Sequence, residues 1–193
     1  MNMRALTGTD DLPRRTFTVK EVERMGEVGL IREGERVELL GGELIPMNAK
    51  GSRHETLKRQ ILRRWYRLAP AEIDLIPETT FRLSDDTFVE PDILLFPLPL
   101  RMSELSASTV LLAVELSDSS LGYDLGPKAL VYAHFGVREL WVIDAIALKI
   151  HVHRDPAEGR YRSITPWGAE DLVAPAFAPS EFALRLADFD LRD

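Results

Sequence analysis

Two acidic residues stand where the sequence predicts buried strands. Glu115 lies inside the apolar run of residues 110–116, and Asp92 stands at the start of the run of residues 93–96. A buried carboxylate needs a partner, because burying an unpaired charge is costly. Carboxylate oxygens are the ligands that Mg²⁺ and Mn²⁺ prefer, and Mg²⁺ is usually held by only one or two of them. The pair therefore predicts a divalent metal site.

A metal site that handles phosphate usually also has a fixed positive charge, and Lys128 is the candidate. The residue two positions after Glu115, where a lysine could stand on the strand itself, is a serine. In the helix predicted from "DLGPKALVYAHFG", Lys128 lies three residues after Leu125 and four before Tyr132, so it shares their inward face. An inward lysine needs an anionic partner. Its long side chain can reach back from the first turn of this helix to Glu115.

A second helix is predicted from "SRHETLKRQILRRWYRL", residues 52–68. Its apolar stripe at helical spacing consists of Leu57, Ile61, Trp65 and Leu68. His54 lies one turn before the first of these residues and therefore points inward. Its opposite side carries a basic run of Lys58, Arg59, Arg63, Arg64 and Arg67. Such a run is usually a solvated face, but beside a site that handles phosphate it is the best candidate for a track along a nucleic-acid backbone.

Glu38 belongs to a predicted hairpin. The segment "RVELLGGELIPM" has two alternating runs around Gly41-Gly42, which indicates a two-residue turn. This turn places Glu38 opposite Ile45, on a face that it shares with apolar side chains. We therefore expect Glu38 to be at least partly shielded from water.

The remaining pattern indicates one mixed domain. Strands are predicted at residues 73–86 and 87–97, a hairpin at residues 149–166 and a last strand near the end of the chain. With the two helices and a short helix predicted from "FTVKEVERMGEVG", this gives an α/β or α+β domain over residues 17–193, after a disordered lead-in of residues 1–16.

Composition narrows the class of protein. The chain of 193 residues has no cysteine, which excludes disulfides, thiolate zinc sites and cysteine nucleophiles. No apolar run is long enough to span a membrane, so we expect a cytoplasmic protein. The net charge of −7 argues against a protein that coats nucleic acid by bulk electrostatics, but not against one local basic patch.

The ordered set of motifs resembles the PD-(D/E)XK nuclease superfamily. More closely it resembles the Uma-type restriction endonucleases, in which the lysine has moved to the following helix. The motifs are "VELLGGEL", "GSRHETL", "EPDILLF", "AVELSDSS" and "GVRELWVID", together with Lys128, and they cover the chain from about Phe17 to its end. The chain departs from that branch at the Gly41-Gly42 turn, usually Asp-Gly, and in "DSSLGYD", where a proline and a threonine are usual.

The resemblance implies a fold, an activity and a set of roles. The fold would be a restriction-endonuclease-like core, a central mixed sheet flanked by helices with added antiparallel hairpins. The activity would be Mg²⁺- or Mn²⁺-dependent endonucleolytic cleavage, with DNA as the expected partner and a dimer as the expected assembly. Asp92, Glu115 and the carbonyl of Leu116 would hold the metal. Glu38 would be a further ligand or support one, and His54 would shuttle a proton or contact phosphate.

Each residue also has a plain structural interpretation. Asp92 could be a turn residue, and Glu115 with Lys128 could be a buried ion pair without chemistry. His54 could be a core histidine, and Glu38 an ordinary half-exposed strand residue. The convergence of all of them on one place favours a site.

Two other functions stay open. One is a non-catalytic nucleic-acid-binding or regulatory protein that kept the fold, and an intact set of site residues speaks against it. The other is a phosphodiesterase that acts on a small nucleotide, which the acidic net charge favours. A basic groove or a closed pocket around Asp92 would distinguish between these substrates.

Overall fold

The computed structural model describes residues 14–191. Its helices are α2 (Val19–Glu27), α3 (Ser52–Leu68), α4 (Leu121–Tyr123) and α5 (Ala129–Phe135), and a π-helical turn, η2 (Asp124–Lys128), joins α4 to α5. Its strands are β1 (Val37–Leu40), β2 (Glu43–Pro46), β3 (Ile73–Pro77), β4 (Phe81–Arg82), β5 (Phe88–Val89), β6 (Ile93–Pro97), β7 (Leu112–Ser117), β8 (Glu139–Asp144), β9 (Lys149–Ala157) and β10 (Arg160–Trp167). No helix in this part of the chain is long and apolar enough to cross a membrane.

The expected boundaries can be compared only in part. Most of the predicted lead-in, residues 1–13 of 1–16, lies outside the described residues. The assignment of residues 17–193 to one domain stays a prediction. The strand expected at the end of the chain is wrong, because this segment forms short 3₁₀ turns and one isolated bridge between Val173 and Leu184.

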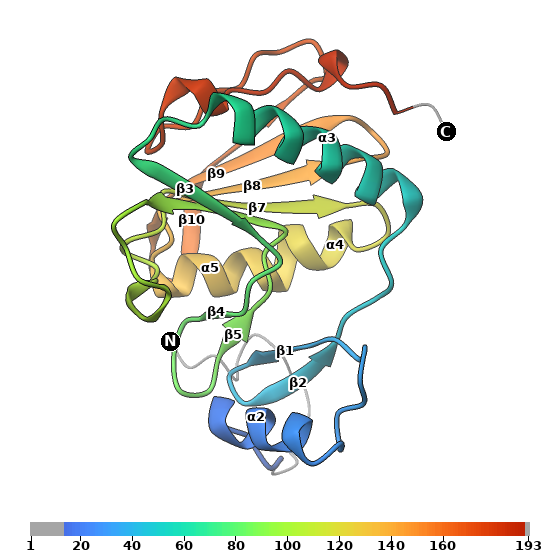
Figure 1. The fold of residues 1–193 in the computed structure, drawn as a ribbon, viewed down its shortest axis with the longest axis vertical. Helices are drawn as coiled ribbons and strands as arrows, with labels where there is room; N and C mark the ends of the chain where they lie inside the picture. The colour runs from blue at the N-terminus through green and yellow to red at the C-terminus, as the bar shows by residue number, and fades with distance from the viewer. Residues whose placement is uncertain (1–13, 192–193) are drawn as a thin grey trace.

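The larger sheet has six strands in the order β10-β9-β8-β7-β6-β3. Strands β7 and β8 are parallel and the other neighbouring pairs are antiparallel. The parallel pair is connected by the crossover through α4, η2 and α5, as a parallel connection requires. Helix α3 and the C-terminal segment lie on one face of this sheet, and α4 and α5 lie on the other (Figure 1). The expected mixed sheet flanked by helices is thus confirmed.

The smaller sheet has four strands in the order β2-β1-β5-β4, with α2 beside it (Figure 1). The β1–β2 hairpin has the predicted register, with Glu38 opposite Ile45. Gly41 and Gly42 both have positive φ angles, 60° and 84°. A two-residue hairpin turn of this kind requires such angles, and glycine adopts them without steric cost.

The two strands predicted at residues 73–86 and 87–97 are each divided between the sheets. Strands β3 and β6 belong to the larger sheet, and β4 and β5 belong to the smaller one. The first break contains Glu78, whose φ of 51° is uncommon for a residue other than glycine. The second contains Pro91, which has no N–H to donate to a ladder. This second break places Asp92 where the chain passes from one sheet to the other.

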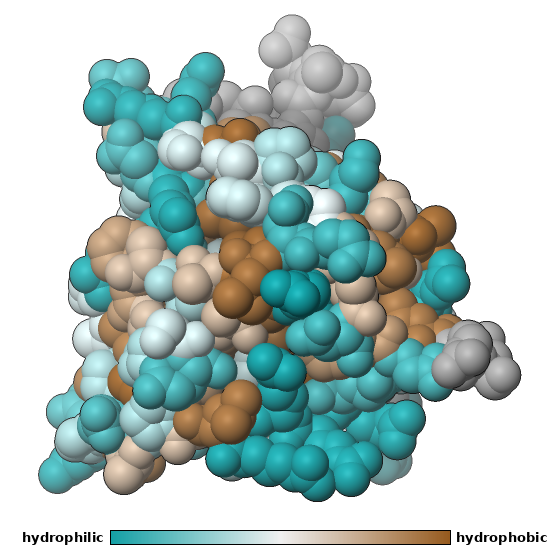
Figure 2. Space-filling model, turned by 90° about the horizontal axis from the view of Figure 1, so that it is seen from above, coloured by the Kyte–Doolittle hydropathy of each residue, from teal (hydrophilic) through white to brown (hydrophobic). Residues whose placement is uncertain are grey.

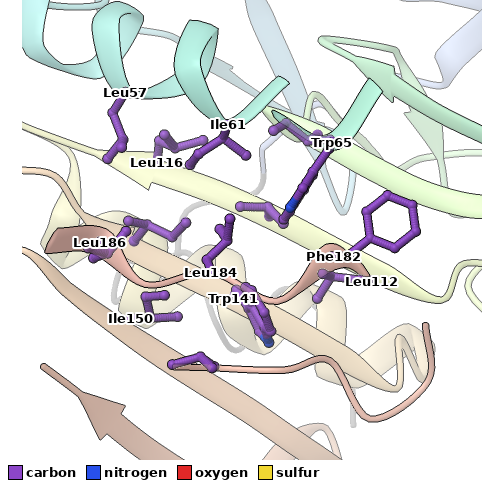
Figure 3. Packing of buried hydrophobic residues seen from close by; sticks show 14 of the residues in the cluster. Leu57, Ile61, Trp65, Leu112, Leu116, Trp141, Ile150, Phe182, Leu184 and Leu186 are labelled. Carbon is purple, nitrogen blue, oxygen red and sulfur yellow. The ribbon is translucent and has the colours of Figure 1, made fainter. Parts of the chain in front are cut away.

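The main core lies between α3 and the larger sheet (Figure 3). Leu57, Ile61 and Trp65 are fully buried and point from α3 toward the sheet, where they pack with Leu112 and Leu116 of β7. Fully burying a side chain of this size contributes about 1.5–3 kcal/mol. This packing fixes the orientation of α3, and therefore of the histidine in its first turn.

Two positions of α3 differ from the prediction. Leu68, expected on the buried stripe, is 45% exposed at the last residue of the helix. Lys58, expected on the solvent side, is buried, and its ammonium donates to Glu55 and Glu78 at 2.6 and 2.5 Å. A lysine can lie at the edge of the apolar stripe when carboxylates from its own helix and from a neighbouring segment pair with it.

Candidate active site

The ammonium of Lys128 lies between two buried carboxylates. Its Nζ is 2.9 Å from Glu115 Oε2 and 2.8 Å from Glu38 Oε1, and the three side chains are at most 3% exposed. It also donates to the backbone carbonyl of Glu90 at 3.4 Å. The helix that follows β7 therefore carries the lysine back onto Glu115.

Asp124, Lys128 and Tyr132 are spaced by four residues and are buried on the same side of this helix. The Tyr132 hydroxyl donates to Glu115 Oε1 at 2.5 Å. The segment Asp124–Lys128 is the π-helical turn, and such turns inside α-helices are frequent at functional sites. Two groups from one helix, a lysine and a phenol, thus bind the two oxygens of Glu115.

Glu38 is held from three sides. Its Oε2 accepts from the Tyr123 hydroxyl at 2.8 Å, and its Oε1 accepts from the Glu90 N–H at 2.9 Å as well as from Lys128. Glu38 is fully buried, which excludes the interpretation as a half-exposed strand residue. It brings the smaller sheet into contact with the helix that carries Lys128.

Asp92 accepts from three groups. Its Oδ2 accepts from the Leu116 N–H at 2.8 Å and lies 3.0 Å from His54 Nε2, and its Oδ1 accepts from Lys50 Nζ at 2.7 Å. Burial by itself raises the pKa of Asp92, but the hydrogen bond with His54 and the Lys50 ammonium outweigh it and hold the pKa below its ordinary value. Asp92 therefore stays ionised at neutral pH.

Asp92 and Glu115 are cross-strand neighbours. Strands β6 and β7 are antiparallel with Ile93 opposite Val114, so the same register continued by one residue places Asp92 opposite Glu115. Residues opposite each other in an antiparallel pair share a face of the sheet. The two carboxylates that the sequence singled out accordingly line the same pocket.

The cluster around Lys128 contains more acidic than basic groups. Burial lowers the pKa of Lys128, but the carboxylates of Glu115, Glu38 and Asp124 outweigh this effect and raise it. Burial raises the pKa of Glu115, Lys128 lowers it and the carboxylates of Asp124, Asp92 and Glu38 raise it, and the pKa lies well above its ordinary value. One ammonium does not balance the acidic groups, and such a surplus favours the binding of a further cation.

Asp124 is a member of the site that the sequence candidates did not include. It is buried, and its Oδ2 accepts from the hydroxyls of Ser117 and Ser120 at 2.6 and 2.5 Å. Its spacing of four residues before Lys128, matched by Tyr132 four residues after, is the signal in the sequence that could have found it.

Lys50 and Glu78 were also missed. Lys50 lies in the segment between β2 and α3, and its Nζ contacts Glu78 Oε1 at 2.5 Å in addition to Asp92. Glu78 pairs with Lys58 as well. Burial raises the pKa of Glu78, but the two lysines outweigh it and lower the pKa to about 2. Neither residue belongs to a periodic run, so no local pattern marks them.

The donors present fit a hard divalent cation. Within residues 14–191, no three His, Asp or Glu side chains form a ready-made metal-binding group. Mg²⁺, however, keeps several waters and is usually held by one or two carboxylates together with substrate phosphates. Asp92 and Glu115 on one face, beside the backbone of Leu116 and in an acidic surrounding, meet that requirement.

These residues line a pocket of about 400 Å³. Its acidic, basic and histidine lining residues are Glu38, Lys50, His54, Glu90, Asp92, Glu115, Asp118, Asp124 and Lys128. Acidic side chains outnumber basic ones, and the arginines of α3 are not among them. The surroundings of Asp92 are thus an acidic pocket rather than a basic groove.

The arginines of α3 lie elsewhere. Arg59, Arg63 and Arg67 are exposed, whereas Lys58 is buried in ion pairs. Figure 2 shows the molecule from above, the side on which α3 lies in Figure 1, and hydrophilic side chains cover much of this face. Of the five residues in the predicted basic run, these three arginines are therefore accessible to a large partner, whereas Arg64 is half-buried.

A mixed sheet flanked by helices, with one carboxylate just before β6, another on β7 and a lysine beside them, is the arrangement expected of a restriction-endonuclease-like protein. The chain belongs to the Uma2 family, described as "Putative restriction endonuclease", whose model matches residues 19–187. This confirms the resemblance that the motifs indicated.

A solved structure has the same fold. It is the crystal structure of "a putative nuclease belonging to DUF820" from Anabaena variabilis ATCC 29413, with a TM-score of 0.63 and 18% sequence identity over 80% of this chain and 89% of that chain. No curated protein is significantly similar to this chain.

Proposed function

We propose that this chain is a metal-dependent endonuclease that hydrolyses phosphodiester bonds, with DNA as its substrate. The observation that carries the proposal is the Lys128 ammonium, fixed between Glu115 and Glu38 in the pocket that Asp92 also lines. Hydrolysis of a phosphodiester needs an activated water and neutralisation of the negative charge that grows on the phosphate. The family description supports a nuclease.

Lys128 would supply fixed positive charge. Glu115 and Glu38 hold its Nζ in place, so the charge needs no reorganisation as the reaction proceeds. The long contact with the carbonyl of Glu90, 3.4 Å, is the one that a phosphate oxygen would replace. Lys128 would then bind the phosphate while the two carboxylates keep it oriented.

Asp92, Glu115 and the carbonyl of Leu116 are the groups that would hold Mg²⁺ or Mn²⁺. The bound cation would lower the pKa of a coordinated water and polarise the phosphate. The role of the chain is to orient these oxygens. The Leu116 N–H and His54 do so for Asp92, and the Tyr132 hydroxyl does so for Glu115.

His54 acts in this proposal through Asp92. Its Nε2 is 3.0 Å from Asp92 Oδ2 and its Nδ1 is 3.0 Å from Glu55 Oε1, so both ring nitrogens have partners. This arrangement supports a positioning role over the proton shuttle or phosphate contact that the resemblance implied.

The contact with DNA outside the pocket is assigned to Arg59, Arg63 and Arg67 on α3. Exposed arginines bind phosphates by charge and by paired hydrogen bonds, independently of base sequence. A dimer would double this basic surface, and sedimentation at several protein concentrations tests it. The cell compartment that we propose is the cytoplasm.

The test of the activity is cleavage of supercoiled plasmid and of single-stranded DNA with Mg²⁺ or Mn²⁺, compared with EDTA. Glu115→Gln should abolish cleavage. The matched control is Glu139→Gln, because Glu139 is also fully buried in an ion pair but does not line the pocket. Equal loss of cleavage in both folded variants, or equal cleavage by wild type and Glu115→Gln, would contradict the proposal.

A specific observation favours a second candidate, a phosphodiesterase for a small nucleotide. The pocket of about 400 Å³ is within the range of small-molecule sites, about 300–1,000 Å³, and its lining is acidic. A cyclic dinucleotide and a dinucleotide, each offered with Mn²⁺, distinguish the candidates. Turnover of these compounds without cleavage of DNA would assign the chain to the second class.

A further inference from the structure

We propose that Lys50 occupies the cation-binding oxygen of Asp92 and is displaced from it when a divalent cation binds, while its ion pair with Glu78 remains. The inference rests on the proposed function, because it concerns the cation that would bind to Asp92. It assigns to Lys50 and Glu78 a role in setting the affinity of the site.

The first argument is that the two oxygens of Asp92 have different partners. Oδ2 is engaged by groups of the folded core, the Leu116 N–H at 2.8 Å and the ring of His54 at 3.0 Å. Oδ1 accepts from Lys50 at 2.7 Å. A cation that binds to Asp92 without breaking the β-strand contact must therefore take Oδ1. It cannot share this oxygen with an ammonium at contact distance, since the two positive charges repel each other.

The second argument is the nature of the Lys50 side chain. It stands in the segment between β2 and α3 that has no regular structure, and 15% of its surface is exposed. A lysine has three donors on a flexible four-carbon chain, so it can leave one acceptor and keep another. Leu116, by contrast, donates from the backbone of a central strand and cannot move.

The third argument is Glu78, which gives Lys50 a second place to bind. Its carboxylate contacts Lys50 and Lys58, each at 2.5 Å. Its backbone has a φ of 51°, and its N–H donates to the carbonyl of Asp92 at 3.3 Å. Backbone strain of this kind persists where the surroundings impose it and is concentrated at functional sites. Glu78 is thus fixed beside Asp92 and can retain Lys50 after Oδ1 has been taken.

The competition lowers the apparent affinity for the cation. When only a fraction of molecules has Oδ1 available, the apparent Kd equals the intrinsic Kd divided by that fraction. Removing the Lys50 ammonium leaves Oδ1 of Asp92 available to the cation in every molecule. For a fraction near one tenth, Lys50→Met would tighten the binding of Mn²⁺ by about tenfold.

The experiment is calorimetric titration of Mn²⁺ into wild type, Lys50→Met and Lys58→Met, with no nucleic acid present. Lys58→Met is the matched control, because Lys58 pairs with the same carboxylate of Glu78 but not with Asp92. We expect tighter binding for Lys50→Met and a change of less than about twofold for Lys58→Met. Unchanged or weaker binding in Lys50→Met, equal tightening in both variants, or no binding of Mn²⁺ to any of the three proteins would overturn the inference.

A second measurement uses the wild-type chain and does not depend on a variant that folds. Lys50 should react faster with an amine-acylating reagent when Mn²⁺ is present, because only one of its two carboxylates still holds it, and Lys58 should not change. Mass spectrometry of the modified peptides reports both residues in one sample. A rate for Lys50 that is unchanged or lower with Mn²⁺ contradicts the displacement.

These results are separable from the cleavage assay. Tighter Mn²⁺ binding in Lys50→Met, together with no cleavage by wild type, would support the displacement of Lys50 and contradict the nuclease activity. Cleavage by wild type, together with unchanged Mn²⁺ affinity in Lys50→Met, would support the nuclease activity and contradict the displacement.

Discussion

The chain buries two carboxylate clusters on neighbouring strands, and they differ in their balance of charge. On β8, Glu139 accepts from Arg154 at 2.6 Å, from Trp141 Nε1 at 2.9 Å and from the Ala176 N–H at 2.7 Å. On β7, Glu115 shares the ammonium of Lys128 with another acid.

The cluster of Glu139, in which the charges balance, has a structural role. Arg154 also donates to the carbonyl of Ala174 at 3.0 Å, so the Glu139 cluster ties the segment that follows β10 to the sheet. Its charges and its hydrogen bonds are satisfied within the chain. The cluster of Lys128 has an acidic surplus that the chain does not neutralise. A buried ion pair that is complete in itself indicates structure, whereas a buried surplus of one sign indicates a ligand of the other sign.

The largest expected effect that separates the clusters is on cleavage. Lys128→Met should lower the rate of DNA cleavage by about 10²–10³-fold, about 3–4 kcal/mol of transition-state stabilisation, because a fixed charge beside the phosphate is removed. Arg154→Met, which removes the cation of the other cluster, should leave the rate of the folded enzyme within about twofold of wild type. Single-turnover rates at saturating Mg²⁺ measure both, and similar losses in the two variants would remove the distinction.

The next effect is stabilisation by the cation. A ligand present at 100 times its Kd stabilises the fold by about 2.7 kcal/mol when it does not bind the unfolded chain. Mn²⁺ should raise the Tm of wild type and of Glu139→Gln, but not that of the Asp92→Asn, Glu115→Gln double variant. A Tm rise in the double variant equal to that of wild type would place the cation elsewhere.

The third effect is on stability without a cation, where we expect the larger loss for the variant of the Glu139 cluster rather than for the variant of the Lys128 cluster. Glu139→Gln should cost about 2 kcal/mol or more, because it leaves the Arg154 guanidinium without its buried partner. Glu115→Gln should cost less, because Lys128 keeps Glu38 at 2.8 Å and the acidic surplus is reduced. Urea unfolding in EDTA compares the free energies of unfolding of the two variants. A larger loss for Glu115→Gln would contradict an excess of acidic groups around Lys128.

The fourth effect is the pH dependence of the same measurement. The pKa of Glu115 is raised in the fold from an ordinary value of 4.5. Between these two values the folded chain binds more protons than the unfolded chain, so this residue lowers the free energy of unfolding as the pH rises above 4.5. Glu115→Gln removes this contribution. Its stability relative to wild type should therefore improve as the pH rises above 4.5, and a relative stability that declines as the pH rises would contradict the direction of the shift.

The smallest effect on stability is expected for exposed charges that belong to neither cluster. Changing Arg59, Arg63 and Arg67 together to Ser should alter the free energy of unfolding by less than about 1 kcal/mol. DNA binding should weaken. The negative slope of log K against log salt should become shallower by about 2.7, which is about 0.9 for each phosphate that is no longer bound. Fluorescence anisotropy at several salt concentrations, with catalysis blocked by Ca²⁺ in place of Mg²⁺, measures the slope. An unchanged slope would indicate that these arginines are solvated and do not contact DNA phosphates.

The sequence by itself determined the features that depend on local order along the chain. The Gly41-Gly42 turn fixed the register of the hairpin, because two positive φ angles leave few alternatives, and this register buried Glu38. Helical spacing placed His54 on the inner side of α3 and Lys128 on the inner side of its own helix, where both were found.

Only the tertiary structure decided which distant groups meet in the pocket. Lys50, Glu78 and Asp92 come from three separate segments, and two of these segments change sheets at breaks that no periodicity marks. Lys58 is buried because Glu78, twenty residues further along the chain, supplies a carboxylate to it. The physical reason is that periodicity reports which face of an element is apolar, whereas the partner of a buried charge is fixed by how the elements pack against one another.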